Sequence, residues 1–220
     1  MCFSASASFV TSATLGIVGV ATITKSKTWA ELPLASMPLI FSIQQFIEGL
    51  LWIANPNSLV HTAATYGYIS FAYVIWPAVW PWAAFLVEPK FLRKKLLFLA
   101  ATLGTIVGIY FLIFLLKGAA TATVLGSGIL YDFKVPYLNT LHGLYAVAAI
   151  AAGIFSSKRF ILIFGLALAT ALVATIVVFN TTYVSVWCFF AALLSLIIFM
   201  HFVSESKKTR EGAHLDRIIN

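Results

Sequence analysis

The residues with the most chemical potential in this sequence are polar side chains inside an apolar run. The segment FSIQQFIEGLLW holds Gln44, Gln45, Glu48 and Trp52 among residues that are otherwise almost all apolar. Gln44, Glu48 and Trp52 are spaced four apart, so they share one face of a helix. A carboxyl group in hydrocarbon is costly unless it is neutral or paired, and we therefore predict polar partners for Glu48 from other helices.

A histidine in a second apolar run is the predicted partner. His142 follows Asn139 by three residues in LNTLHGLYAV. We predict a polar, outward-facing cavity with Glu48 and His142 as its ionisable centre. The other residues expected to line it are Gln44, Gln45, Trp52, Tyr66, Asn139, Trp187 and Cys188. The alternatives are that Glu48 holds helices together by hydrogen bonds and that His142 lies at the membrane interface.

A divalent metal is a weaker interpretation of the same side of the protein. The side chains of metal-ligand type expected there are Cys2, Glu48, His61, Asp132 and His142. None of them is arranged in a recognised ligand spacing such as HxxxH or CxxC, so the sequence favours no particular metal.

Composition determines the elements that must position these residues. Of the 220 residues, 61% are hydrophobic and 10% are charged, against roughly a quarter charged in soluble domains. Runs of about 20 apolar residues predict transmembrane helices, because backbone groups in lipid must be paired within their own segment. We predict an all-α integral membrane protein, in which a membrane domain (1–204) precedes a polar tail (205–220) that is a short helix or disordered. The seven predicted spans are 7–24, 32–54, 63–87, 95–116, 138–156, 159–179 and 182–204.

The basic residues predict the orientation of these spans. Twelve Lys and Arg residues lie after spans 1, 3, 5 and 7, and two, Lys117 and Lys134, lie on the opposite side. Positive residues are retained in the cytoplasm, so the N-terminus is predicted outside and the C-terminus inside. The formal charge of +7 lies in short clusters between apolar runs, which argues for a topology signal and against nucleic-acid binding. We expect the lipid bilayer and a small-molecule ligand as partners, and leave oligomerisation open.

Two further patterns concern the third span. It aligns with the seventh at an offset of 117 residues, where Thr65-Tyr66 meets Thr182-Tyr183 and Glu88 meets Glu205, which suggests two three-helix units joined by the fourth span. Apolar sequence also aligns with itself by chance. Pro77 and Pro81 predict a kinked or unwound third span, and the tryptophans around them indicate either a substrate path or an aromatic belt. The outer segment 117–137 is expected to be a re-entrant segment, a lid or a plain connector.

The opening MCFSASASF and the segment IQQFIEGLLW resemble a bacterial family of small integral membrane proteins that begin MCFSAxASF and carry IQQxxEGxxW in the second helix. The resemblance implies that Cys2, Gln44, Gln45, Glu48 and Trp52 belong to the family pattern, and a place in the bacterial inner membrane; it implies no activity. The layout is also similar to microbial rhodopsins and to sugar transporters built as three plus one plus three helices. Retinal is not expected, because the seventh span holds no lysine for a Schiff base.

Three function classes remain from the sequence. The first is a small-molecule or proton-coupled transporter or binding protein. The second is an intramembrane, metal-dependent hydrolase with Glu48 as general base. The third is a sensory or structural subunit of a membrane complex, in which the polar residues only pack helices together.

Overall fold

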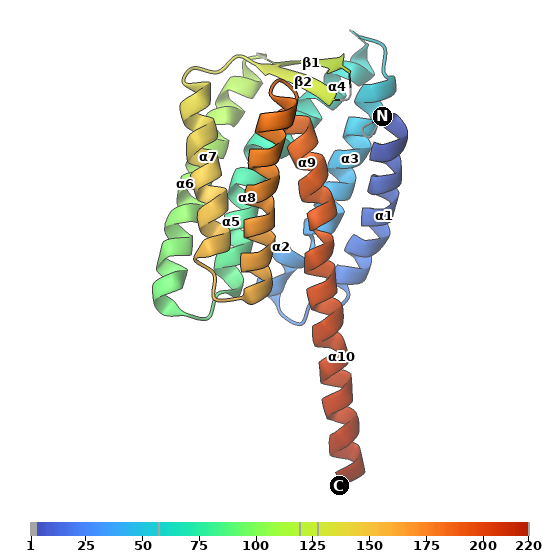
Figure 1. The fold of residues 1–220 in the computed structure, drawn as a ribbon, viewed down its shortest axis with the longest axis vertical. Coiled ribbons are helices and arrows are strands. Elements are labelled where there is room, and N and C mark those ends of the chain that lie inside the picture. The colour runs from blue at the N-terminus through green and yellow to red at the C-terminus, as the bar shows by residue number, and fades with distance from the viewer. Residues whose placement is uncertain (1–3, 57, 119, 127, 220) are drawn as a thin grey trace.

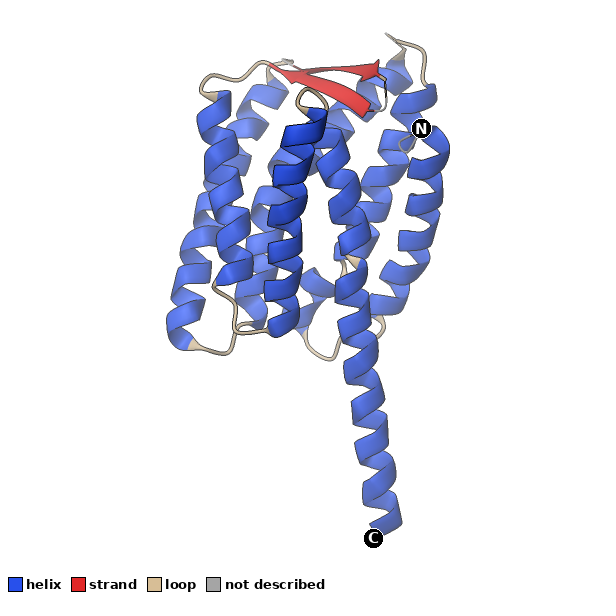
Figure 2. Cartoon of the chain, viewed as in Figure 1, coloured by secondary structure: helices blue, strands red, loops and turns tan. Residues whose placement is uncertain are grey.

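The computed structural model describes residues 4–56, 58–118, 120–126 and 128–219, of which 209, 210 and 212–219 are described by their backbone alone. The chain forms a bundle of long helices whose connections lie at its two ends (Figures 1 and 2). The helices are α1 (Ala5–Ile23), α2 (Leu32–Ala35), α3 (Met37–Ile53), α4 (Leu59–Ile69), α5 (Trp76–Val87), α6 (Phe91–Leu116), α7 (Leu138–Ile154), α8 (Arg159–Phe179), α9 (Tyr183–Leu194) and α10 (Leu196–Ile219).

The described residues form six continuous helical segments long and apolar enough to cross a membrane. These are Ala5–Ile23, Trp29–Ile53, Leu59–Val87, Phe91–Leu116, Arg159–Phe179 and Tyr183–Lys208, and α7 is a shorter apolar helix of 17 residues. Exposed Leu, Ile, Val and Phe side chains cover the outside of the bundle, as expected for a surface in contact with lipid. The chain is therefore an all-α integral membrane protein, as predicted.

The third span is interrupted near its first proline. A π-helical segment, Ser70–Ile75, separates α4 from α5, and Pro77 stands in the first turn of α5. Proline cannot donate the backbone hydrogen bond that would continue a regular helix, and π segments are found frequently at functional sites. Pro81, in contrast, lies inside α5. The predicted irregularity is present, and it precedes the prolines.

A β-hairpin covers the end of the bundle at which α1 begins (Figure 1). Strands β1 (Ala120–Leu125) and β2 (Gly128–Phe133) pair antiparallel, with Ala120 opposite Phe133 and Leu125 opposite Gly128. The hairpin contacts α3, α4 and α9. The sequence predicted a re-entrant segment, a lid or a connector here; strands were not foreseen.

Two glycines allow helix α6 to pack closely against the interrupted span. A Cβ atom on Gly104 of α6 would lie 1.8 Å from the carbonyl oxygen of Pro77, and one on Gly108 would lie 2.7 Å from that of Val74. Only glycine permits this approach, which is a common means of association between helices in lipid. The glycines thus hold α6 against the π segment.

Glu88 fixes the loops at the opposite end, just after α5. Its carboxylate accepts hydrogen bonds from the Ser156 hydroxyl at 3.0 Å, the Ser157 amide at 2.6 Å and the Lys90 amide at 3.1 Å. Burial opposes ionisation of Glu88, but these donors outweigh it and hold its pKa below the ordinary value. Beyond these loops α10 continues as a helix to Ile219, so the backbone of the predicted tail is helical as far as it is described.

Candidate functional site

The second span carries a buried polar cluster centred on Glu48. Gln44, Gln45 and Glu48 of α3 are at most 2% exposed. The Glu48 carboxylate accepts hydrogen bonds from the Ser185 hydroxyl of α9 at 2.5 Å and from Gln45 Nε2 at 3.0 Å. Gln44 Oε1 accepts a hydrogen bond from the Trp76 indole of α5. Helices α3, α5 and α9 therefore meet at these polar groups.

Four polar atoms of the cluster form no hydrogen bond of ordinary distance and angle within the described residues. They are Gln44 Nε2, Gln45 Oε1 and the hydroxyls of Tyr68 and Tyr131, all buried. The Tyr68 ring of α4 stacks on the Tyr131 ring of β2, with centroids 4.3 Å apart and planes inclined by 3°. Tyr131 thus brings the hairpin down onto the cluster. Buried polar atoms without partners are uncommon in folded proteins and call for a physical explanation, such as ordered water or a ligand.

His142 lies in a separate cavity within the same bundle. Its Nδ1 is 2.9 Å from the Tyr183 hydroxyl of α9, while its Nε2 is buried and has no partner among the described residues. The cavity measures about 200 Å³. Its walls are mostly apolar and come from the π segment, α7, α8 and α9; Tyr73, Ala146, Leu172 and Trp187 are among them. The residues of the lining that carry polar groups include His142, Tyr183, Tyr73 and Tyr145.

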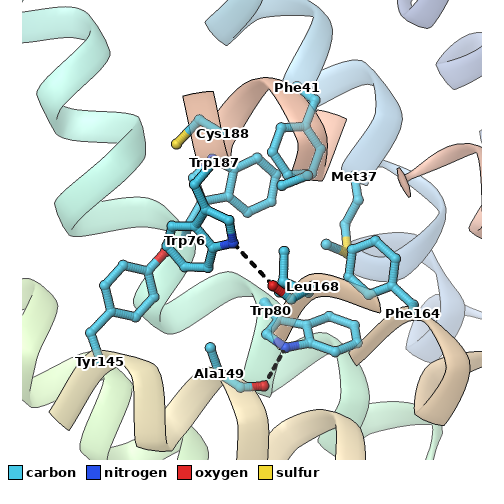
Figure 3. A pocket seen from close by; sticks show the side chains of 11 residues that line it. Met37, Phe41, Trp76, Trp80, Tyr145, Ala149, Phe164, Leu168, Trp187 and Cys188 are labelled. Carbon is cyan, nitrogen blue, oxygen red and sulfur yellow. Dashed lines mark hydrogen bonds between the residues drawn. The ribbon is translucent and has the colours of Figure 1, made fainter. Parts of the chain in front are cut away.

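Figure 3 shows an aromatic chamber that shares the lining residues Tyr145, Trp187 and Cys188 with this cavity. It holds only about 20 Å³ of free space between Phe41, Trp76, Trp80 and Phe164, among others. The Trp80 indole donates to the Ala149 carbonyl at 2.8 Å, and the Trp187 indole donates to that of Leu168 at 3.2 Å. Trp76 and Trp80 are 4% and 3% exposed, so these two tryptophans are interior residues and not part of a lipid-facing belt.

Helix α9 is the element that connects the two parts of the site. Ser185 of α9 reaches Glu48, Tyr183 reaches His142, and Cys188 and Trp187 line both the cavity and the aromatic chamber. No hydrogen bond or ion pair between Glu48 and His142 themselves occurs among the described residues. The two groups predicted as an ionisable centre are therefore held by neighbouring residues of one helix, not by each other.

The remaining predicted residues lie elsewhere. Trp52 is half-buried against the core and lines neither space, and Asn139 is exposed in the first turn of α7. Tyr66 and His61 line another pocket, of about 370 Å³, beneath β1. Asp132 is exposed on β2.

The predicted metal ligands do not gather in one place. Cys2 lies outside the described residues, and no three His, Cys, Asp or Glu side chains within the described part of the chain come together as a metal site. His61 lines the pocket beneath β1, and Asp132 is exposed, away from the cavity that holds His142.

Comparison with protein families matches residues 1–213 to DUF6629, described as a family of unknown function. The chain belongs to DUF6629. This confirms the expected membership of a family without an assigned function. Searches of curated proteins and of solved structures gave no match.

Sequence reasoning did not select Ser185, Tyr131, Tyr183 or Trp76 of this DUF6629 protein as site residues. Ser185 is one of many hydroxyl residues in the apolar spans, and only the rotation of α9 decides that it faces Glu48. Trp76 carried a signal, since it directly precedes the proline at the interrupted span. Tyr131 carried one too, since it stands in an alternating apolar segment typical of a strand.

Proposed function

We propose that this protein binds a small, mostly apolar molecule with one hydrogen-bonding group in the His142 cavity, as part of transport across the bacterial inner membrane or its regulation. The observation that carries the proposal is the cavity of about 200 Å³ that His142 and Tyr183 line, together with the buried His142 Nε2, which has no hydrogen-bond partner among the described residues. Cavities lined by apolar walls with few polar groups are typical ligand sites.

The size of the cavity limits the ligand. Engineered apolar cavities of about 150 Å³ bind benzene, so a space of about 200 Å³ suits a molecule with one ring and a small substituent. The aromatic walls provided by Tyr73 and Trp187 favour a planar ligand. His142 Nε2 supplies a single directional contact, as donor or acceptor according to the tautomer.

Glu48 is proposed as the proton-sensitive part of this device. A carboxyl group inside a membrane bundle is a common element of proton-coupled transport. Ser185, which donates to Glu48, lies two residues from Tyr183, which contacts His142. A change of protonation at Glu48 would alter the Ser185 hydrogen bond and so bias the position of α9 at the cavity.

The proposed topology has seven spans, α7 included, with the N-terminus and the hairpin on the extracytoplasmic side. The distribution of Lys and Arg supports this orientation. The proposed 3+1+3 repeat gains support from one pair of residues. At the offset of 117 residues Tyr68 corresponds to Ser185, and both side chains lie beside Glu48.

Binding of phenol to the purified protein tests the proposal. Phenol has one ring and a hydroxyl that either donates or accepts, and we expect it to raise the thermal stability of the wild-type protein. Ala146→Phe fills the cavity from α7 and should abolish the shift. Val147→Phe adds a similar ring next to it, on an exposed position outside the cavity, and should leave the shift unchanged. Equal shifts in both variants would overturn the proposal.

The proton-sensitive role has its own test. The affinity of the wild-type protein for phenol should depend on pH. His142→Phe should remove the contribution of the imidazole to this dependence, and Glu48→Gln should remove the contribution that remains. A pH profile unchanged by Glu48→Gln would exclude Glu48 from the device. The hydrolase and complex-subunit alternatives remain predictions from the sequence. The hydrogen bond between Glu48 of α3 and Ser185 of α9 also fits the helix-packing role that the complex-subunit alternative gives to the polar residues.

A further inference from the structure

A second space lies at the opposite end of the bundle, where the connections of three helices meet. This basic cleft has a volume of about 520 Å³. It lies between the segment after α1, the beginning of α8 and the middle of α10. Its cationic side chains are Lys25, Lys27, Lys158 and Arg159.

The acidic residues of the cleft already have partners. Glu31 accepts a hydrogen bond from the backbone amide of Lys27 at 2.7 Å, and Glu205 forms an ion pair with Lys208 at 3.3 Å. Lys25, Lys158 and Arg159, in contrast, form no ion pair within the described part of the chain. Four cationic side chains against two carboxylates leave the lining of the cleft with a net positive formal charge.

The apolar part of the lining consists of Phe160, Ile163 and Phe202, and Ser157 and His201 lie among them. Phe160 of α8 stacks on His201 of α10 with ring centroids 3.6 Å apart, and Ile163, one turn further along α8, is 46% exposed. A free inorganic anion would use the cations alone. A molecule with an anionic head and an acyl chain would use the cations and also cover Ile163 and Phe160.

We propose that the basic cleft binds the phosphate of an anionic phospholipid from the adjacent leaflet. Lys25, Lys158 and Arg159 would contact the phosphate, and the acyl chain would lie along α8. Basic pockets between transmembrane helices are suited to such headgroups. This inference does not depend on the His142 cavity, which is lined by different residues.

Native mass spectrometry of the full-length protein in detergent, titrated with dioleoylphosphatidylglycerol, tests the proposal. We expect saturable binding of one lipid. Lys158→Gln with Arg159→Gln should weaken it roughly 30-fold, because each basic residue near anionic lipid changes the affinity about fivefold. Lys94→Gln with Lys95→Gln removes the same charge from α6, outside the cleft, and serves as the matched control. Its affinity should stay within about twofold of the wild type, as the far smaller effect of distant charges predicts.

Three results would overturn the proposal. Equal loss in both double variants would mean that the attraction is general and not located in the cleft. Equal binding of dioleoylphosphatidylcholine would mean that the cations do not select the lipid. Full competition by millimolar inorganic phosphate would mean that the site takes a free anion. Thermal unfolding of each variant without lipid establishes that it is folded, and Lys158→Gln alone, expected about fivefold weaker, provides a milder second variant.

Discussion

Two substitutions of Glu48 distinguish the contribution of its hydrogen bonds to stability from the contribution of its charge. Glu48→Ala leaves the Ser185 hydroxyl and the Gln45 amide without their acceptor and opens a cavity. Each buried group left unpaired costs about 1–3 kcal/mol, and truncation of a side chain of this length adds about 2 kcal/mol or more. We therefore expect the free energy of unfolding to fall by roughly 4–8 kcal/mol.

Glu48→Gln has the same shape and should behave differently. The side-chain oxygen of the introduced glutamine can accept the hydrogen bond from Ser185. Its amide can donate to Gln45 Oε1 once the Gln45 side-chain amide flips, since that oxygen has no hydrogen-bond partner among the described residues of the wild-type protein. The free energy of unfolding should change by less than about 1 kcal/mol. Titration with sodium dodecyl sulfate in mixed micelles, followed by circular dichroism, measures both variants. If Glu48→Ala were as stable as Glu48→Gln, the hydrogen-bond cluster would not stabilise the bundle and the reasoning would be refuted.

Three other predictions concern the His142 cavity, the loops held by Glu88 and the close contact between α6 and the interrupted span. His142→Phe keeps a ring in the cavity wall but removes the proposed hydrogen bond between Nε2 and the ligand. The affinity for phenol should therefore fall about 2- to 12-fold, while the affinity for toluene should not fall. Calorimetry measures both affinities, and an equal loss for the two ligands would contradict the role of Nε2. Glu88→Gln should destabilise the protein at neutral pH. Because the folded-state pKa of Glu88 lies below its ordinary value of 4.5, the difference in stability between the variant and the wild type should shrink as the pH falls below about 4.5. A difference in melting temperature that stays constant from pH 7 to pH 3 would disprove this. Gly104→Ala should lower the melting temperature strongly, because the new Cβ would meet the Pro77 carbonyl. Gly143→Ala should not lower it, because its new Cβ would have no atom of another helix within 4 Å. Similar melting temperatures for the two variants would argue against the close contact at Gly104.

The helical frame was predictable from the sequence because hydrocarbon leaves few backbone solutions. Apolar runs and their polar interruptions predicted where helices begin, as for α7 at Leu138 and α8 at Arg159. The hairpin was not predicted, because the segment 117–137 lies between long apolar helices. The alternating pattern from Ala120 to Leu125 is nevertheless typical of a β-strand.

The site was predictable only in part. Glu48, Gln44 and Gln45 are conspicuous because polar groups are rare in these spans, and their burial follows from the cost of exposing them to lipid. Which side chains face them depends on the rotation of helices distant in sequence. Glu48 therefore meets Ser185, 137 positions away, and not the more conspicuous His142.

A structure of the protein with bound 4-iodophenol tests the central claim most directly, because the iodine gives an unambiguous position. The account predicts iodine density inside the cavity among Tyr73, Leu172 and Trp187, with the phenol hydroxyl within hydrogen-bond distance of His142 Nε2. An empty cavity with iodine only on the outer surface of the bundle, at a concentration at which phenol stabilises the protein, would contradict it.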